Sequence, residues 1–333
     1  MIRNLWYAVL ESRELKEAPL GLTRLGERLV FWRGPDGAPV CFFDRCAHRG
    51  AALALGKVCE GGTLQCPFHG LEYDPSGRCV RIPANGRDAP VPPEFRMARY
   101  PTYEGYGIIW IWWGDASGVS PGEIGEPAFF DDLKAMRHWT TVRDPWDNHY
   151  TRVLENQLDV VHLPFVHHNT IGRGHKTLVE GPGLEWRGDT LFFVYVFNKK
   201  DDGSRPRSSR EVPIPPQDRD FRLELIFPNL WENHISEKAR VLGIFVPVDE
   251  THTLLYLRFY QSFIRLPVIR EAVGALASRF NLIVAHQDRR VVNTQLPKGD
   301  GIGKGELLIP GDLPIMEFRK KRMELRKSAE RGR

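Results

Sequence analysis

Two short stretches in the first quarter of the chain each combine one cysteine with one histidine. Cys46-Ala-His48 is followed, after seventeen residues, by Cys66-Pro-Phe-His69. A two-iron cluster with thiolates on one iron and imidazoles on the other needs such a mixed pair twice, and its imidazoles raise its reduction potential. A structural zinc site is the alternative, but zinc fingers pair cysteine with cysteine and histidine with histidine. The pattern predicts an electron-relaying [2Fe-2S] cluster on Cys46, His48, Cys66 and His69.

The three remaining cysteines do not fit this pattern. All five cysteines lie between residues 41 and 79, and an odd number argues against a disulfide framework. We expect Cys41, Cys59 and Cys79 to be small residues of the core.

A second set of candidate ligands lies in the stretch ENQLDVVHLPFVHHN. Asn156, Asp159 and His162 are spaced by three residues, so on a helix they would share one face. Pro164 is expected to break that helix and let His167 turn back towards the same point. Two histidines and one carboxylate on one face of an iron leave positions open for O₂ and substrate.

Asp288 is the natural candidate for that carboxylate. In SRFNLIVAHQDRRVV it follows Phe280 and Val284 and precedes Val291 on a helical stripe that is otherwise apolar. A carboxylate on such a face is costly unless it is paired or binds a metal. The sequence therefore predicts a mononuclear iron on His162, His167 and Asp288.

The elements that must position these residues differ between the two parts of the chain. Apolar runs around Gly34–Gly37 and Pro75–Gly77 predict hairpins, and YGIIWIWWG predicts a closing strand. The Gly- and Pro-rich stretch DASGVSPGEIGEP is the best candidate for a domain boundary. Strands then precede a long helix over about 268–295 and a last helix over 313–331. This order predicts an α+β fold with the long helix across a sheet.

Composition excludes several classes of protein. The last sixteen residues hold eight basic and two acidic residues, a charge of +6, so the rest of the chain carries about −2 of the net charge of +4. A solvated terminal helix, or a docking surface for an acidic electron carrier, explains this charge, and nothing else suggests nucleic-acid binding.

No apolar run approaches the roughly 18 residues of a membrane span, and the N-terminus lacks a signal-peptide pattern. We expect a cytoplasmic protein with no membrane association.

Together, these stretches resemble the α subunits of Rieske non-heme iron oxygenases, the ring-hydroxylating oxygenases. The likeness runs from CAHRGAALALGKV through CPFHGLEYDPSGRC and includes LWYAV and YGIIWIWWG, and the second set of ligands extends it over nearly the whole chain. The chain departs from the family at Leu71, where members commonly have tryptophan. Its short length resembles the branch without a β subunit, which includes vanillate-demethylase-like enzymes.

The resemblance implies a [2Fe-2S] Rieske domain over residues 1–117. It implies a helix-grip (START-like) catalytic domain over 118–333, with a curved antiparallel sheet around a long helix. His167, rather than His168, matches the family spacing of the iron ligands. Asp159 matches the residue that bridges a cluster histidine of one subunit to an iron histidine of the next in a homotrimer. Asn156 is expected near the iron.

The function implied is that of a terminal oxygenase component that hydroxylates, or oxidatively demethylates, an aromatic or small cyclic substrate. O₂ is the co-substrate, the mononuclear site holds Fe(II), and NAD(P)H acts only through a partner reductase, with or without a ferredoxin. Monooxygenase, dioxygenase and demethylase reactions all stay open. The alternative is a Rieske electron carrier or binding protein without oxygenase turnover, which would hold two irons per chain rather than three.

Overall fold

A computed structural model describes residues 1–114, 124–188, 191–214, 222–298 and 305–331 of the chain. Two compact units are present, one formed by residues 3–127 and the other by 128–333, with Met1 grouped with the first unit and Ile2 with the second. The boundary predicted between residues 117 and 118 lies outside the described residues. Within the described ranges, no helix is long and apolar enough to cross a membrane.

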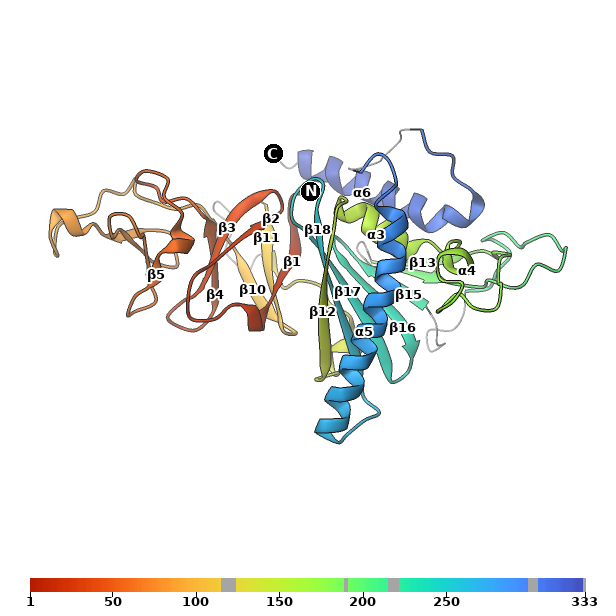
Figure 1. Ribbon diagram of the computed structural model, residues 1–333. Helices are drawn as coiled ribbons and strands as arrows, with labels where there is room; N and C mark the ends of the chain where they lie inside the picture. Colours follow the sequence, from red (N-terminus) through yellow and green to blue (C-terminus); the bar gives the residue numbers. More distant parts are fainter. Residues whose placement is uncertain (115–123, 189–190, 215–221, 299–304, 332–333) are drawn as a thin grey trace. The chain divides into compact units, whose positions relative to one another are not determined.

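The first unit consists of three small antiparallel sheets (Figure 1). The first sheet has the order β1 (Leu5–Glu11), β11 (Ile108–Trp113), β10 (Thr102–Gly105). The second has the order β2 (Leu20–Arg24), β3 (Glu27–Arg33), β4 (Pro39–Phe43), β9 (Arg99–Tyr100). The third has the order β5 (Lys57–Val58), β6 (Leu64–Gln65), β7 (Glu72–Tyr73), β8 (Cys79–Arg81). Short 3-10 helices cover Ser12–Glu14, Leu53–Leu55 and Pro83–Asn85.

Both predicted hairpins are confirmed, because β3 pairs with β4 and β7 pairs with β8. Gly37 and Gly77 have φ values of +80° and +88°, which suit glycine at these two turns. Leu71 is buried in the core beside Trp32 and Tyr73, so the residue that departs from the family is accommodated there.

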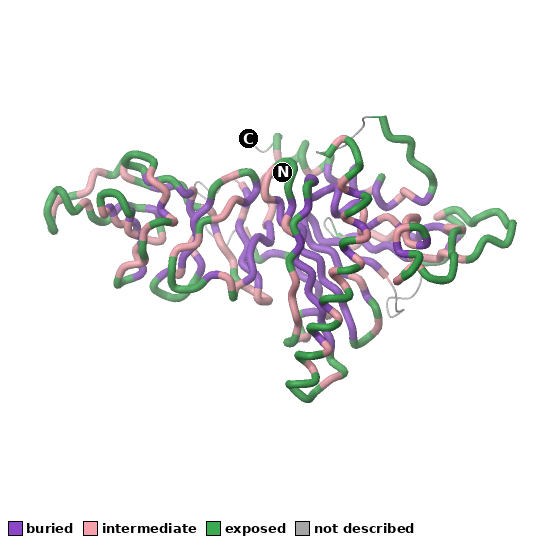
Figure 2. The backbone as a smooth tube through the Cα atoms, viewed as in Figure 1, coloured by how far each residue is buried: buried purple, intermediate pink, exposed green. Residues whose placement is uncertain are grey.

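The second unit is built on one antiparallel sheet of seven strands. Its order is β12 (Trp139–Trp146), β18 (Thr253–Gln261), β17 (Ala239–Pro247), β16 (Leu230–Ser236), β15 (Arg222–Ile226), β14 (Leu191–Tyr195), β13 (Gly183–Arg187). The described helices are α2 (Asp131–Lys134), α3 (Tyr150–Leu158), α4 (Leu163–Val166), α5 (Pro267–Val292) and α6 (Leu313–Arg331), with a 3-10 helix at Pro310–Asp312. Figure 2 shows that the central strands are buried almost throughout.

The long helix α5 lies across one face of this sheet, which we call the helix side (Figure 1). Thr140 on β12 donates a hydrogen bond of 2.9 Å to the carbonyl of Gly274, and its hydroxyl lies 2.7 Å from that of Ser278. A Cβ at Gly274 would lie only 2.5 Å from Thr140, so a small residue is needed there. The predicted α+β class, with a helix-grip arrangement, is therefore confirmed.

The buried face of α5 differs from the predicted stripe. Apart from Val292 at its end, its buried residues are small or polar and include Ser278, Ala285 and Asp288, whereas Phe280 is 45% exposed and Val291 is 37% exposed. The apolar pattern was misleading because close packing against Thr140 favours small side chains over large ones. Asp288 does lie on the buried face, but its neighbours there are not the predicted ones.

Candidate metal centres

Two matching loops carry the predicted cluster ligands. In each loop the N–H of a glycine with positive φ, Gly50 or Gly70, donates to the carbonyl of the cysteine that begins the loop. The cysteine N–H in turn donates to the carbonyl of the residue after that glycine, Ala51 or Leu71, at 2.8 Å in both loops. The N–H groups of the two glycines thus close the loops.

The loops bring the four side chains together in two layers. Cys46 and Cys66 are buried beneath the surface, whereas His48 and His69 are exposed with their ring centroids 4.8 Å apart. Burial, more than any other cause, raises the pKa of the Cys66 thiol, and a metal would remove this cost because it binds the thiolate. Two buried sulfurs below two solvent-facing imidazoles suit a cluster with thiolates on the inner iron and histidines on the outer one.

The segment with the second set of ligands folds differently from the prediction. Helix α3 ends at Leu158, because Asp159 Oδ1 accepts hydrogen bonds from the N–H groups of Val161 (2.7 Å) and His162 (3.3 Å). Pro164 then lies in the first turn of α4, which begins at Leu163, rather than ending a helix, since the first turn of a helix tolerates proline. His162 and Asn156 therefore do not share a helix. A turn built by Asp159 positions His162.

Three metal-binding atoms nevertheless converge at one point. His162 Nε2 lies 3.3 Å from His167 Nε2 and 3.3 Å from Asp288 Oδ1, and His167 Nε2 lies 2.9 Å from Asp288 Oδ1. Ligands bound at about 2.1 Å and about 90° apart would be separated by about 3.0 Å. The triangle therefore has the dimensions of one face of a metal coordination sphere.

The hydrogen-bonding pattern also fits a metal. Oδ1 of Asp288 is buried and makes no hydrogen bond to any residue that the structure describes, although two imidazole nitrogens lie within ion-pair distance. His167 is held from behind, because its Nδ1 lies 2.8 Å from Oε1 of Gln287 and must donate to it. This leaves the lone pair of Nε2 directed at the site. A carboxylate oxygen that faces this lone pair requires a cation or a proton between them.

Without a metal, the site binds a proton. Burial opposes the charge on His162, but Asp159 and Asp288 outweigh it and raise its pKa to about 9. Burial likewise opposes the charge of Asp288, yet His162 and His167 lower its pKa to about 2. Nδ1 of His162 lies 3.5 Å from Asp159 Oδ2, which is within ion-pair distance but is not a well-formed hydrogen bond. The polarity of the site favours a bound cation.

Two other residues of the same stretch, His168 and Asn156, are not in the triangle of donor atoms. His168 is exposed, and its Nδ1 contacts the carbonyl of Phe165 rather than the site. Asn156 has a buried Nδ2 that makes no hydrogen bond to any described residue, His162 and His167 included. Sequence reasoning missed Gln287, which also lies 2.8 Å from the hydroxyl of Thr170 and from Asn169 Oδ1. Its position beside Asp288 was the only available signal.

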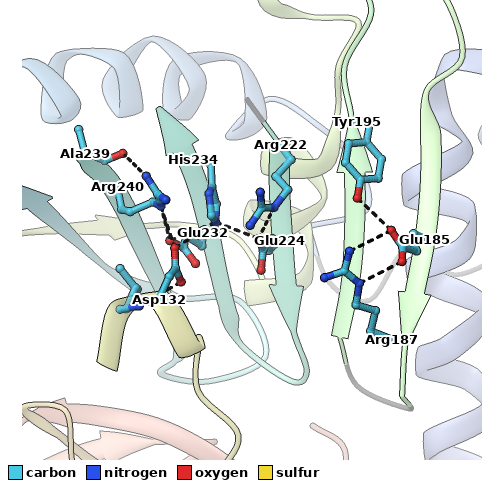
Figure 3. A network of polar contacts seen from close by, with 11 residues as sticks. Asp132, Glu185, Arg187, Tyr195, Arg222, Glu224, Glu232, His234, Ala239 and Arg240 are labelled. Atoms are coloured by element: carbon cyan, nitrogen blue, oxygen red, sulfur yellow. Dashed lines mark hydrogen bonds and ion pairs between the residues drawn. The ribbon is translucent and has the colours of Figure 1, made fainter. Parts of the chain in front are cut away.

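A second cluster of candidate ligands lies on the opposite face of the sheet (Figure 3). His234 Nε2 is 2.8 Å from Glu224 Oε1 and 3.5 Å from Glu232 Oε1. Arg240 Nε is 2.8 Å from Asp132 Oδ2, and Arg222 pairs with Glu224. Two guanidinium groups and an imidazole already balance three carboxylates here. We interpret this cluster as a buried ionic network rather than a metal site.

Comparison with known proteins identifies the family. A model of the Rieske [2Fe-2S] domain matches residues 5–103, and a model of the vanillate O-demethylase oxygenase C-terminal domain matches residues 146–328. The chain belongs to the Rieske oxygenases of the vanillate O-demethylase type. The cofactors of this Rieske oxygenase are therefore a [2Fe-2S] cluster and a mononuclear iron, as the resemblance implied.

Individual relatives agree with the family models. This Rieske oxygenase is 37% identical to the oxygenase component of dicamba O-demethylase from Stenotrophomonas maltophilia over 166 residues. The aligned segment covers 50% of this chain and 48% of the relative. The chain is 28% identical to methylxanthine N1-demethylase NdmA from Pseudomonas putida over 340 residues. This alignment covers 99% of this chain and 91% of NdmA. The solved structure of NdmA superposes with a TM-score of 0.76 at 25% identity and covers 98% of this chain and 94% of NdmA. The match to the dicamba enzyme thus spans about half of that relative's length.

Proposed function

We propose that this chain is the terminal oxygenase component of a multicomponent Rieske system. In this proposal it uses O₂ and electrons from a separate reductase, with or without a ferredoxin, to oxidise a small aromatic or cyclic substrate. The observation that carries the proposal is the triangle of His162, His167 and Asp288, whose three donor atoms lie 2.9 to 3.3 Å apart. An electron carrier would have no use for this second site, so the alternative function loses its support.

Each candidate residue then has a role in the proposal. Cys46, His48, Cys66 and His69 hold the cluster, and His162, His167 and Asp288 hold the iron. The iron, when bound, supplies the site at which O₂ is activated. Asp288 and His167 are 3% and 1% exposed, so the chain itself keeps bulk water away from two of the three ligands. Asn156 is the weakest assignment and rests on its buried, unpaired Nδ2 near the end of α3.

Asp159 is proposed to link the two metal centres in an oligomer. It is half-buried and lies beside Nδ1 of His162, on the side away from the metal-binding Nε2. A homotrimer, in which the cluster of one subunit serves the iron of the next, is supported by apolar side chains that α5 leaves exposed. Leu276 is 69% exposed and Ile283 is 50% exposed, and contact with a second subunit would cover such residues.

Oxidative demethylation is the reaction we favour among those left open. Two relatives are named as an O-demethylase and an N1-demethylase, and the family model carries the name of a third demethylase. Hydroxylation of a methyl group on oxygen gives a product that releases formaldehyde. The balanced reaction is R–O–CH₃ + O₂ + NAD(P)H + H⁺ → R–OH + HCHO + NAD(P)⁺ + H₂O. We place the protein in the cytoplasm, where a reductase can draw on soluble NAD(P)H.

The test is product analysis with the reconstituted holoenzyme. The chain, loaded with both metals, is combined with a surrogate reductase, NADH and a panel of methoxylated aromatics, N-methyl heterocycles and fused rings. The proposal predicts substrate-dependent NADH oxidation with stoichiometric formaldehyde or hydroxylated product. A reduced cluster that passes electrons to an acceptor protein, with no product from any member of the panel, would favour the electron carrier.

A further inference from the structure

Four charged side chains join helices α3 and α6, and we call them the α3–α6 network. They are Arg152 and Glu155 on α3, Glu306 in the segment before α6, and Arg319 on α6. Arg319 donates to both oxygens of Glu155, from Nε at 2.8 Å and from Nη2 at 2.7 Å. Nη1 of Arg319 and Nη1 of Arg152 each donate to one oxygen of Glu306 at 2.6 Å. Arg152, Glu155 and Arg319 are buried, and none of the four belongs to the proposed metal sites or to the network of Figure 3.

The network fixes how α3 and α6 are oriented relative to one another. Burial opposes the charge of Glu306, but Arg319 and Arg152 lower its pKa below the usual range, so the carboxylate stays ionised. An apolar contact could join two helices equally well, because the loss of water around buried charges offsets much of their attraction. A planar guanidinium that donates two parallel hydrogen bonds adds a defined geometry, which an apolar contact lacks. The pair of Arg319 and Glu155 therefore holds the last turn of α3 in one position.

Glu155 connects this network to the turn that carries His162. The carbonyl of Glu155 accepts a hydrogen bond of 3.0 Å from the N–H of Asp159, the residue that ends α3. Oδ1 of Asp159 in turn accepts hydrogen bonds from the N–H groups of Val161 and His162. The side chain of Glu155 is thus held by α6, while its backbone holds the residue that shapes the turn. A continuous series of hydrogen bonds leads from Arg319 to His162.

The start of α6 contacts the same turn a second time. A Cβ at Gly311 would lie 2.5 Å from Cγ2 of Val161, so the absence of a side chain lets the backbone before α6 pack directly on this valine. Phe318, next to Arg319, is fully buried and stacks on Phe227 with ring centroids 5.3 Å apart. Helix α6 is therefore anchored to the end of β15 beside its ion pair with α3 (Figure 1).

A third contact comes from the sheet. Nδ2 of Asn198, which follows β14, donates a hydrogen bond of 2.6 Å to the carbonyl of Val160. Three segments that are far apart in the sequence thus hold the turn between residues 159 and 162. Removal of one of these holds should loosen the turn without unfolding it.

We propose that Arg319 is a positioning residue of the mononuclear site. Through Glu155 it holds the turn of Asp159 and His162 in the geometry that directs Nε2 of His162 towards the other two ligands. The inference deepens the proposed function and rests on it. It gives α6, which contributes none of the three proposed iron ligands, a role in iron binding. Replacement of residues that orient metal ligands commonly weakens metal binding by about 10- to 100-fold.

Arg319→Lys tests this role before any mononuclear iron is added. Lysine keeps the positive charge but cannot donate two parallel hydrogen bonds to Glu155 from a planar group. Hydrogen–deuterium exchange is measured on the full chain with its cluster. We expect the amides of Asp159, Val161 and His162 to exchange at least about tenfold faster than in the wild type, because they lose local protection. The amides of β17 should exchange at the wild-type rate.

Iron affinity is the second measurement. Fe(II) titrated into the same proteins should bind about tenfold more weakly to Arg319→Lys than to the wild type, with an unchanged cluster spectrum. Glu155→Gln keeps the size of the side chain and one acceptor oxygen, and its iron affinity should change in the same direction. A wild-type chain that binds no second iron would contradict the proposed function, whereas the exchange measurement would still decide the positioning role.

Arg322→Lys is the matched control. Arg322 is also buried on α6, but its guanidinium lies over the rings of Tyr150, at the start of α3, and of Phe318, at 5.8 and 6.0 Å from their centroids. This variant should keep wild-type exchange in the turn and wild-type iron affinity.

Two kinds of result would overturn the proposal. The first is wild-type exchange and iron affinity in Arg319→Lys, or changes of equal size in Arg322→Lys. The second is loss of folding in both Arg319→Lys and Glu155→Gln, because the network would then support the whole unit rather than one turn.

Discussion

Oε1 of Gln287 lies 2.8 Å from Nδ1 of His167, and the next residue, Asp288, presents its carboxylate to the other nitrogen of the same ring at 2.9 Å. One turn of α5 thus contributes both a proposed iron ligand and the group that orients a second ligand. Thr170 donates to the same amide oxygen, and the Gln287 N–H₂ donates to Asn169. This small network keeps His167 in the tautomer whose Nε2 can bind a metal.

Gln287→Leu should weaken binding of the mononuclear iron by about 10- to 100-fold, because the imidazole loses the partner that orients it. The visible spectrum of the cluster should not change. Iron affinity is measured by titration of Fe(II) into chelated protein that retains its cluster. Gln287→Glu, which keeps an acceptor oxygen, should bind iron nearly normally. Unaltered iron affinity in Gln287→Leu would show that His167 is held by other contacts.

His162→Ala should lose the mononuclear iron and keep the cluster, because only one of the two sites depends on this side chain. Metal analysis together with the cluster spectrum measures both sites in one sample. His168→Ala is the matched control, since His168 is exposed and contacts only the carbonyl of Phe165 among the described residues. Simultaneous loss of both signals in His162→Ala would contradict two independent sites.

Asp159→Asn should retain both metals but slow product formation by at least about 100-fold, a loss comparable with that on removal of one preorganised polar group from an active site. Asparagine keeps an oxygen for the turn that ends α3, so the variant separates the charge of Asp159 from its structural role. The readout is single-turnover product formation after the cluster is reduced. Product formed at the wild-type rate would refute the proposed link between subunits.

The ionic network of Figure 3 should make the protein less stable as the pH rises through neutrality. Burial raises the pKa of Glu232 from 4.5 to about 7, although His234 opposes the shift. Neither carboxylate oxygen of Glu232 has a hydrogen-bond partner among the described residues, and Oε1 lies 3.4 Å from Nε of Arg240 and 3.5 Å from Nε2 of His234. Its contribution is fully present below pH 4.5 and is lost by about pH 7. The carboxylates of Asp132 and Glu224 also act on Glu232 and raise its pKa, and Arg222 pairs with Glu224.

Glu232→Gln should therefore flatten the dependence of melting temperature on pH between 5 and 8. The raised pKa of Glu232 corresponds to at most about 3 kcal/mol of unfolding free energy. The raised pKa of His234 acts in the same direction above its ordinary value of 6.5, so some slope should remain. Glu185→Gln is the control, because the pKa of Glu185 is lowered by Arg187 and it titrates below this window. The same slope in wild type and Glu232→Gln would contradict this interpretation.

The residues proposed for the first metal site were chosen from their spacing alone. The two mixed Cys–His pairs, their turn-forming glycines and the flanking hairpins are all local features, and local features can be read from a sequence. The roles of Gly50 and Gly70 could not be predicted, because a hydrogen bond from their N–H groups to the cysteine carbonyls depends on the loop conformation.

The second site required contacts between distant parts of the chain. Asp288 was identified because a carboxylate on a buried helix face needs a partner, and it lies beside His162 and His167. The stripe around it was assigned incorrectly, because the pattern of large apolar residues marks the exposed side of α5. The end of α3 at Leu158 was also missed, since the side chain of Asp159 ends the helix before Pro164 is reached.

The central claim is that this chain holds a mononuclear iron in addition to the Rieske cluster, and metal stoichiometry tests it most directly. Iron and acid-labile sulfide are measured per chain after anaerobic reconstitution, with Asp288→Ala prepared in parallel. The account predicts three irons and two sulfides for the wild-type chain, and two of each for Asp288→Ala. Two irons and two sulfides in both proteins would contradict it.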